Sequence, residues 1–293
     1  MTRPRADRGL LTVDCGNTHV SARLFDARAR IGPAGPEPEP TCAWRFAHAD
    51  RTALAAFLRD VSSEVVPDAV ALSAVAAPAL ERELESALSA GGARRVVREP
   101  DARLANRSTR PAAVGRDRLF ADLGALARLQ ARVQPPHRFL VLDAGTALTV
   151  DLVERASDGT GAFLGGAIAP GPELLACALE QGGARLARVD TARAGEVRAW
   201  GRETTEALLA GVVHGFRVAA LELVRELARE GDVEPGAPLF VTGGARAHLL
   251  APPLFDRDEP GARACLEVIE VPALVHEGLL ASLLGAAAGH GGG

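Results

Sequence analysis

Two short segments of the chain combine an aspartate, a glycine and hydroxyl or amide side chains in a pattern suited to binding phosphate. The first covers residues 13–18 (VDCGNT) and the second covers residues 143–149 (DAGTALT). In such a turn, glycine allows a tight bend that brings backbone N–H groups close to a phosphate. The Thr or Asn side chain adds a donor, and the aspartate can hold Mg²⁺. Two such turns, far apart in the chain, predict two lobes that grip one polyphosphate from opposite sides.

Four further segments accompany these turns: GRDR at 115–118, GGAIAPG at 165–171, TTEALLAG at 204–211 and TGG at 242–244. Phosphoryl transfer requires alignment of the reactants, neutralisation of charge and a carboxylate near the attacking oxygen. Such chemistry does not require lysine, and three of these segments each carry an aspartate: Asp14, Asp117 and Asp143.

The amino-acid composition excludes some types of catalytic site and some kinds of binding partner. All 33 basic residues are arginine, which excludes a Walker A phosphate loop and Schiff-base catalysis, because both need lysine. The net charge is −4 and the arginines are scattered, so we expect neither nucleic acid nor a membrane surface as a partner. No signal peptide or membrane-spanning apolar run is evident, and the four cysteines are widely spaced. These features predict a cytoplasmic protein with reduced thiols.

The elements that must position the turns repeat along the chain. Each turn follows one apolar run and precedes another, which predicts a strand–turn–strand hairpin in each half. Helices are expected at 78–90, 117–133 and 203–230. This recurrence predicts a duplicated α/β fold with two domains, residues 9–114 with the first phosphate turn and residues 115–290 with the second phosphate turn.

In this order, the DxGNT, GxDR, DxGTAxT and GGxIxPG strings resemble the type III pantothenate kinase family, also known as the Bvg accessory factor family, over about residues 9–285. The resemblance implies the two-lobed α/β fold of the actin/hexokinase/Hsp70-like superfamily, with ribonuclease H-like lobes and a central cleft. It also implies ATP-dependent phosphorylation of pantothenate to 4'-phosphopantothenate, the first step of coenzyme A biosynthesis. The resemblance also implies Mg²⁺, a monovalent cation (K⁺ or NH₄⁺) and a homodimer with active sites at its interface. For the domain at 115–290 it implies an adenosine segment and a dimer helix.

The family's site residues can be carried over one position at a time. Asp117 would be the catalytic base, and Arg118 would bind the pantothenate carboxylate. Asp14 and Asp143 would hold metal. The implied ATP-binding residues are Asp14, Gly16, Asn17, Thr18, Gly145, Thr146, Gly243 and Gly244. The implied substrate-binding residues are Gly115, Arg116, Asp117, Arg118, Gly165, Gly166 and Thr204, with Thr204 reaching the site of the partner subunit and Gly171 shaping the pocket.

The sequence departs from the family pattern at two positions. The family usually has a tyrosine where this chain has Ser108, and a phenylalanine where it has Ala144. The missing tyrosine, which would contact pantothenate, leaves two alternatives open. One is a catalytically inactive regulatory or binding homologue, and the other is a kinase for a related acceptor alcohol.

Each residue also has a purely structural interpretation. A single Asp-Gly-Thr turn is usually an ordinary β-turn, and Asp117 alone could be an acidic residue favoured by the helix dipole. Gly243 and Gly244 could form a simple strand-to-helix turn, and His19 could be solvated. The six segments in order, rather than any one of them, favour the kinase.

Overall fold

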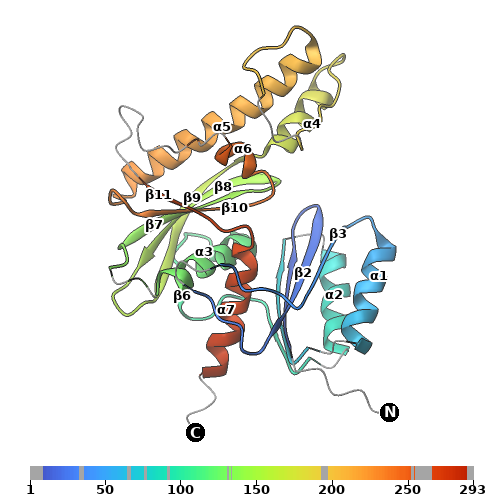
Figure 1. The fold of residues 1–293 in the computed structure, drawn as a ribbon, viewed down its shortest axis with the longest axis vertical. Coiled ribbons are helices and arrows are strands. Elements are labelled where there is room, and N and C mark those ends of the chain that lie inside the picture. Colours follow the sequence, from blue (N-terminus) through green and yellow to red (C-terminus); the bar gives the residue numbers. More distant parts are fainter. Residues whose placement is uncertain are drawn as a thin grey trace. The chain divides into compact units, whose positions relative to one another are not determined.

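The computed structural model describes residues 9–288 apart from 33–35, 65–66, 76–77, 91–92, 131, 133, 193–196, 252–253 and 255–265. The chain forms two compact units (Figure 1). Unit 1 contains the residues up to Pro135, Ser157–Gly161 and the residues from Ala273 onward. Unit 2 contains Pro136–Ala156 and Ala162–Pro272.

Unit 1 is built on a five-stranded sheet of order β3-β2-β1-β4-β5. The strands are β1(Gly9–Cys15), β2(His19–Asp26), β3(Cys42–Ala47), β4(Ala69–Ala74) and β5(Arg95–Val97). β1 pairs antiparallel with β2 and parallel with β4. The helices are α1(Arg51–Arg59), η1(Asp60–Glu64), α2(Pro78–Ala90), η2(Pro111–Ala113), α3(Arg116–Leu129) and α7(Leu274–Ala288), and a short strand β6(Leu104–Asn106) completes the unit.

The two faces of the unit 1 sheet differ in chemistry because side chains alternate along each strand. Leu11 and Val13 of β1 face a core that includes Phe57 of α1 and Leu84 of α2. Thr12 lies on the other face, where α7 packs against β1 and β4. Figure 1 shows α1 and α2 on one side of the sheet and α7 on the other. Asp14, the aspartate of the first predicted phosphate turn, therefore belongs to the polar face of this sheet.

Unit 2 repeats the arrangement. Its strands are β7(Arg138–Ala144), β8(Ala147–Arg155), β9(Gly161–Pro170), β10(Pro238–Thr242) and β11(Glu267–Glu270), in the order β9-β8-β7-β10-β11. β7 pairs antiparallel with β8 and parallel with β10, as β1 does with β2 and β4. Its helices are α4(Pro172–Gly182), α5(Thr204–Glu230) and α6(Ala247–Leu250). This shared strand order confirms the predicted duplication of an α/β lobe.

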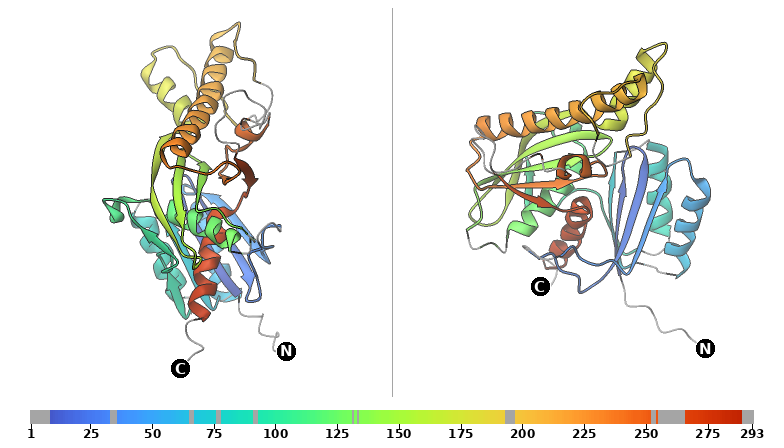
Figure 2. Two further views of the ribbon diagram at one scale, coloured as in Figure 1. Left: turned by 90° about the vertical axis from the view of Figure 1, so that its left-hand side faces the viewer. Right: turned by 45° about the horizontal axis from the view of Figure 1, so that its top comes forward.

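The long helix α5 covers one face of the unit 2 sheet, as Figure 2 shows. Its residues Phe216, Ala220 and Val224 pack against Leu140 and other strand residues in one buried cluster. Among the described residues, α5 is also the one helix that is long and apolar enough to cross a membrane. Core helices can pass the same test, and 33% of this apolar window of α5 is buried within the structure.

The predicted helices at 78–90 and 203–230 are confirmed, the second beginning at Thr204. The helix expected at 117–133 runs from Arg116 to Leu129, and Val133 lies outside the described residues. Helix α1 was not predicted. Its signal is the N-cap Asp50, whose Oδ1 accepts a hydrogen bond of 2.9 Å from the N–H of Ala53.

Candidate active site

The first predicted phosphate turn joins β1 to β2 in unit 1. The N–H of Gly16 donates a hydrogen bond of 3.1 Å to the carbonyl of His19, which closes the turn. Asn17 and Thr18 are exposed at its tip. The Oγ1 of Thr18 lies 3.0 Å from Nδ1 of His19, so His19 contacts a turn residue. The turn thus exposes an amide side chain and a hydroxyl side chain, two groups that can donate hydrogen bonds to a phosphate.

Asp14 lies at the base of this turn in an unfavourable electrostatic position. Its Oδ1 is buried and has no hydrogen-bond partner among the described residues. Burial, followed by the nearby charge of Asp117, raises the pKa of Asp14 from 3.8 to about 7, although Ser73 and Arg45 partly offset this shift. A carboxylate in this state is stabilised by a cation, because an opposite charge compensates for both the burial and the second carboxylate.

The GRDR segment forms the start of α3, with Gly115 as the N-cap. Asp117 lies in the first turn, where the helix dipole favours an acidic side chain. The Oδ1 of Asp117 accepts a hydrogen bond of 2.9 Å from the N–H of Arg118. Burial raises the pKa of Asp117, while the N–H and the charge of Arg118 lower it. The structure therefore brings Asp14 and Asp117 together within unit 1.

Arg116 is held by two ion pairs within unit 1. Its Nη1 lies 2.7 Å from Oε1 of Glu81 on α2, and its Nε lies 2.9 Å from Oε1 of Glu99. These contacts connect the start of α3 to α2 and to the segment after β5. Arg116 thereby supports the helix turn that carries Asp117.

Ser108, at the position of the family's tyrosine, takes part in a local turn. Its Oγ donates a hydrogen bond of 2.7 Å to Oδ1 of Asn106, and its N–H donates a second one of 3.0 Å to the same atom. The Nδ2 of Asn106 donates to the carbonyl of Pro111 at 3.2 Å. The serine hydroxyl therefore stabilises the segment before α3.

The second predicted phosphate turn joins β7 to β8 in unit 2. The N–H of Gly145 donates a hydrogen bond of 3.0 Å to the carbonyl of Ala147, and the N–H of Gly171 donates one of 3.1 Å to the carbonyl of Thr146. A Cβ at position 171 would lie 2.6 Å from that carbonyl oxygen, so only glycine allows this approach. The structure thus places the end of the GGAIAPG segment directly against the DAGTALT turn.

The TGG segment after β10 also packs against the second turn. Gly243 has a φ of +91°, and a Cβ there would lie 2.5 Å from the carbonyl oxygen of Ala144 and would clash with Oδ1 of Asp143. The N–H of Ala245 donates a hydrogen bond of 2.8 Å to the same carbonyl. Ala144 is fully buried, which leaves little room for the phenylalanine common in the family.

The remaining predicted residues of unit 2 lie on other elements. Gly165 and Gly166 lie within β9, and Gly166 is exposed. Thr204 is the first residue of α5 and is exposed, and Gly244 is exposed beside Gly243. In unit 2, Gly171 and Gly243 therefore contact the turn that Asp143 begins, whereas Gly165, Gly166 and Thr204 lie on β9 and at the start of α5.

The donor set suits Mg²⁺ better than a metal bound entirely by protein. Within the described ranges, no group of three or more His, Cys, Asp or Glu side chains could hold a metal ion. Mg²⁺ is usually bound by one or two carboxylates together with phosphate oxygens and water. The buried Oδ1 of Asp14, which lacks a hydrogen-bond partner among the described residues, fits such a site.

One charged residue of the polar face was absent from the sequence-based set. Arg45 lies in β3 between Trp44 and Phe46, and its charge lowers the pKa of both Asp14 and His19. The alternation of aromatic and charged residues in β3 is the sequence signal that could have identified it.

Comparisons with known proteins agree with these motifs. The family described as type III pantothenate kinase matches residues 10–226. A protein of that name from Thermus thermophilus is 35% identical over 257 residues, covering 84% of this chain and 92% of the relative. Another from Cupriavidus taiwanensis is 32% identical over 258 residues, covering 82% and 89%.

Similarity to solved structures is weaker. MreB5 of Spiroplasma citri bound to ADP has a TM-score of 0.49 at 13% identity, covering 98% of this chain and 97% of its own. An inorganic polyphosphate/ATP-glucomannokinase from an Arthrobacter strain has a TM-score of 0.47 at 13% identity, covering 97% and 100%. On the family match and the identity to its curated relatives, this chain belongs to the type III pantothenate kinase family.

Proposed function

We propose that this protein transfers the γ-phosphoryl group of ATP to the terminal hydroxyl of pantothenate, which gives 4'-phosphopantothenate and ADP in the first step of coenzyme A biosynthesis. Family membership and the ordered motifs support this activity. The structural observation that carries it is the pair of carboxylates, Asp14 and Asp117, beside an exposed phosphate turn in unit 1.

Asp117 is the proposed general base. It accepts the proton of the pantothenate hydroxyl as the oxygen forms its bond to the γ-phosphorus and the bond to ADP breaks. The N–H of Arg118 fixes the orientation of the carboxylate, and burial raises its pKa towards neutrality. A base whose pKa lies closer to the working pH drives proton transfer more effectively.

Asp14 and Asp143 are the proposed residues for Mg²⁺, which would neutralise phosphate charge when bound. The turn residues Gly16, Asn17 and Thr18 would donate hydrogen bonds to the phosphates, as would Gly145 and Thr146. Gly243 and Gly244 would lie under the adenine. We also propose a monovalent cation, K⁺ or NH₄⁺, near the second turn, on the resemblance to the family alone.

The acceptor would be bound by Gly115, Arg118, Gly165, Gly166 and Thr204, with Arg118 on the pantothenate carboxylate. The guanidinium group matches a carboxylate in shape and charge. Arg116 would contribute by holding the segment in place, since its ion pairs to Glu81 and Glu99 occupy it.

We propose a cytoplasmic homodimer in which Thr204 contacts the site of the partner subunit. The exposed large apolar side chains of the described residues support an interface on unit 2, since all belong to it: Ile168, Leu174, Leu179, Trp200 and Val218. Light scattering coupled to gel filtration tests the dimer. The functional division at residues 9–114 and 115–290 is likewise a proposal, with one phosphate turn in each part.

The decisive experiment measures pantothenate-dependent release of ADP with ATP, Mg²⁺ and K⁺ for the wild type and for Asp117→Asn. We expect Asp117→Asn to lower kcat by about 10²–10⁴-fold, the usual contribution of a general base. Asp50→Asn is the matched control, because it changes an acidic residue at the start of α1 and Asn remains a good N-cap. A near-normal kcat for Asp117→Asn would exclude it as the base, and a folded wild type that binds ATP without turnover of pantothenate would contradict the proposed reaction.

A further inference from the structure

Four residues form one row across the unit 1 sheet. Asp14 on β1 is the register partner of Ser73 on β4 and of Ser21 on β2, and Ser21 is the register partner of Arg45 on β3. Register partners on adjacent strands point to the same face of a sheet. The side chain of Arg45 therefore lies on the same face as the Asp14 carboxylate, two inter-strand spacings of about 4.8 Å away.

The direction of Arg45 is fixed by its neighbours in β3. The ring of Trp44 meets the ring of Phe57 edge to face at 5.4 Å between centroids, and its Nε1 donates to Oδ2 of Asp60 at 3.1 Å. The ring of Phe46 lies 5.7 Å from that of Phe57. Because Trp44 and Phe46 both pack into the core, the residue between them must point to the opposite, polar face.

The strand that carries Arg45 is attached to the first phosphate turn. The N–H of His48, just after β3, donates a hydrogen bond of 3.1 Å to the carbonyl of Thr18. The Nε2 of His48 also lies 3.9 Å from Sγ of Cys15. The intervening Ser21 has a short side chain, whose Oγ lies 3.0 Å from Nε2 of His276. The side chain between Asp14 and Arg45 in the row is thus a short one that is hydrogen-bonded to His276.

The guanidinium of Arg45 has no carboxylate partner among the described residues, and its side chain is exposed. Two other arginines of unit 1, by contrast, are paired with carboxylates: Arg23 with Glu37 at 3.5 Å and Arg51 with Glu83 at 2.7 Å. The charge of Arg45 nevertheless reaches the turn, because it adds to the effect of burial in lowering the pKa of His19. An arginine that forms an ion pair with a protein carboxylate is not available to bind a ligand. Because Arg45 forms no such pair among the described residues, its guanidinium is available.

We propose that Arg45 is a phosphate-binding residue that contacts the polyphosphate chain of the nucleotide held by the first turn. This inference rests on the proposed kinase function and adds a residue to it. Phosphate oxygens take two parallel hydrogen bonds from a guanidinium, and a chain without lysine must use arginine for this purpose. In the row of four residues, Arg45 supplies a positive charge two strands away from Asp14, and Ser73 lies on the other side of Asp14.

The test is equilibrium binding of AMP, ADP and ATP, each with Mg²⁺, to the wild type and three variants. We expect Arg45→Met to weaken ATP binding by about 10–100-fold, the effect of losing a charged hydrogen bond, and AMP binding by less than about 2-fold. Arg45→Lys should restore part of the affinity, because the charge remains while the paired geometry is lost. Arg28→Met is the matched control, an exposed arginine beyond the far end of β2.

Steady-state kinetics separate this role from a contact with the acceptor. Arg45→Met should raise KM for ATP and leave KM for pantothenate unchanged. The proposal is overturned if Arg45→Met binds all three nucleotides as the wild type does, because the guanidinium would then face solvent. It is also overturned if only KM for pantothenate rises, because the guanidinium would then face the acceptor carboxylate. The binding measurements with AMP, ADP and ATP require no turnover. A wild type that binds ATP but does not phosphorylate pantothenate would contradict the proposed function, and the binding measurements would still decide the role of Arg45.

Discussion

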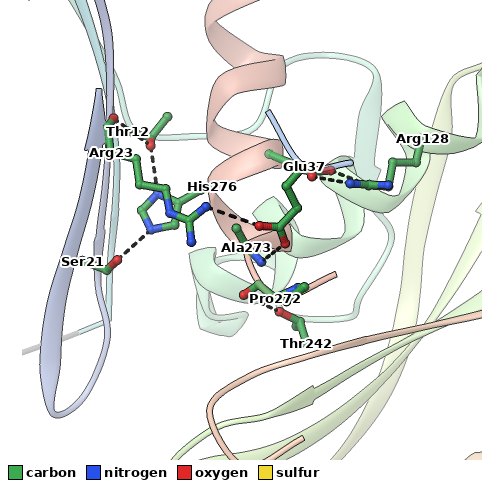
Figure 3. A network of polar contacts seen from close by, with 10 residues as sticks. Thr12, Ser21, Arg23, Glu37, Arg128, Thr242, Pro272, Ala273 and His276 are labelled. Carbon is green, nitrogen blue, oxygen red and sulfur yellow. Dashed lines mark hydrogen bonds and ion pairs between the residues drawn. The ribbon is translucent and has the colours of Figure 1, made fainter. Parts of the chain in front are cut away.

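The Oγ1 of Thr12 lies 2.8 Å from Nδ1 of His276, although 264 residues separate them in the sequence (Figure 3). His276 also reaches Ser21 Oγ through Nε2, so one imidazole ring joins β1, β2 and α7. Burial, helped by the charge of Arg23, lowers the pKa of His276 from 6.5 to about 3. The ring is therefore neutral in the folded protein at physiological pH.

His276→Phe should destabilise the protein by about 1–3 kcal/mol for each hydroxyl left without a partner. The pH dependence provides a second readout. The pKa of His276 is lower in the folded protein than in the unfolded chain. The neutral ring therefore contributes its full stabilisation above pH 6.5, and this stabilisation is lost as the pH falls towards 3. His276→Gln should flatten the decline of the thermal midpoint between pH 6.5 and 5, whereas His137→Gln, at an exposed histidine, should not. An unchanged pH profile for His276→Gln would contradict this account.

Asp14→Asn should stabilise the protein at alkaline pH while it abolishes turnover. The folded pKa of about 7 lies above the unfolded 3.8, so the group's contribution to stability is present in acid and is lost as the pH rises through 7. At pH 8 the folded state therefore holds an unfavourable carboxylate, which Asn removes. We expect the thermal midpoint to rise at pH 8, by about 2–4 °C per kcal/mol gained, and the rise to vanish near pH 4. A lower midpoint at pH 8 would show that Asp14 stabilises the fold.

Arg128 and Glu277 form a buried ion pair between α3 and α7. Two contacts of 2.6 Å join them, and their side chains are only 5% and 2% exposed. Arg128→Met should lower the free energy of unfolding by about 3–5 kcal/mol, because it leaves Glu277 buried without its main counter-charge. The double variant Arg128→Met/Glu277→Met should recover most of that loss in thermal unfolding. The control is Arg51→Met, which breaks an exposed pair and should cost about 1 kcal/mol or less.

Gly243→Ala tests the contact between the TGG segment and the second phosphate turn. Alanine there would be strained at a φ of +91° and would also collide with Ala144 and Asp143. Gly236→Ala is the matched control, since Gly236 has a φ of +85° but open space around its Cβ position. We expect Gly236→Ala to cost about 1–3 kcal/mol from backbone strain alone. Gly243→Ala should lower the stability further and should raise KM for ATP. Equal effects of the two variants would exclude a role for the close approach of Gly243 to Ala144 and Asp143.

The sequence by itself determined the local structure of both phosphate turns. Strand–Asp–Gly–strand signals predicted the hairpins on either side of Gly16 and Gly145, and both are present. The leucines of α3 recur at the spacing of one helix face, and all four are buried: Leu119, Leu123, Leu126 and Leu129. These features depend on turn chemistry and side-chain period, which act over a few residues. The ordered motifs also determined the family.

Only the tertiary structure decided which distant residues meet. No local pattern indicated that Gly171 packs on Thr146, that His276 joins Thr12 to Ser21, or that Arg45 shares a row with Asp14. Helix α1 was also missed, although its N-cap Asp50 is visible in the sequence. The physical reason is that strand register and helix packing result from the burial of many side chains at once, so contacts across a sheet are fixed by the whole core and not by the residues that make them.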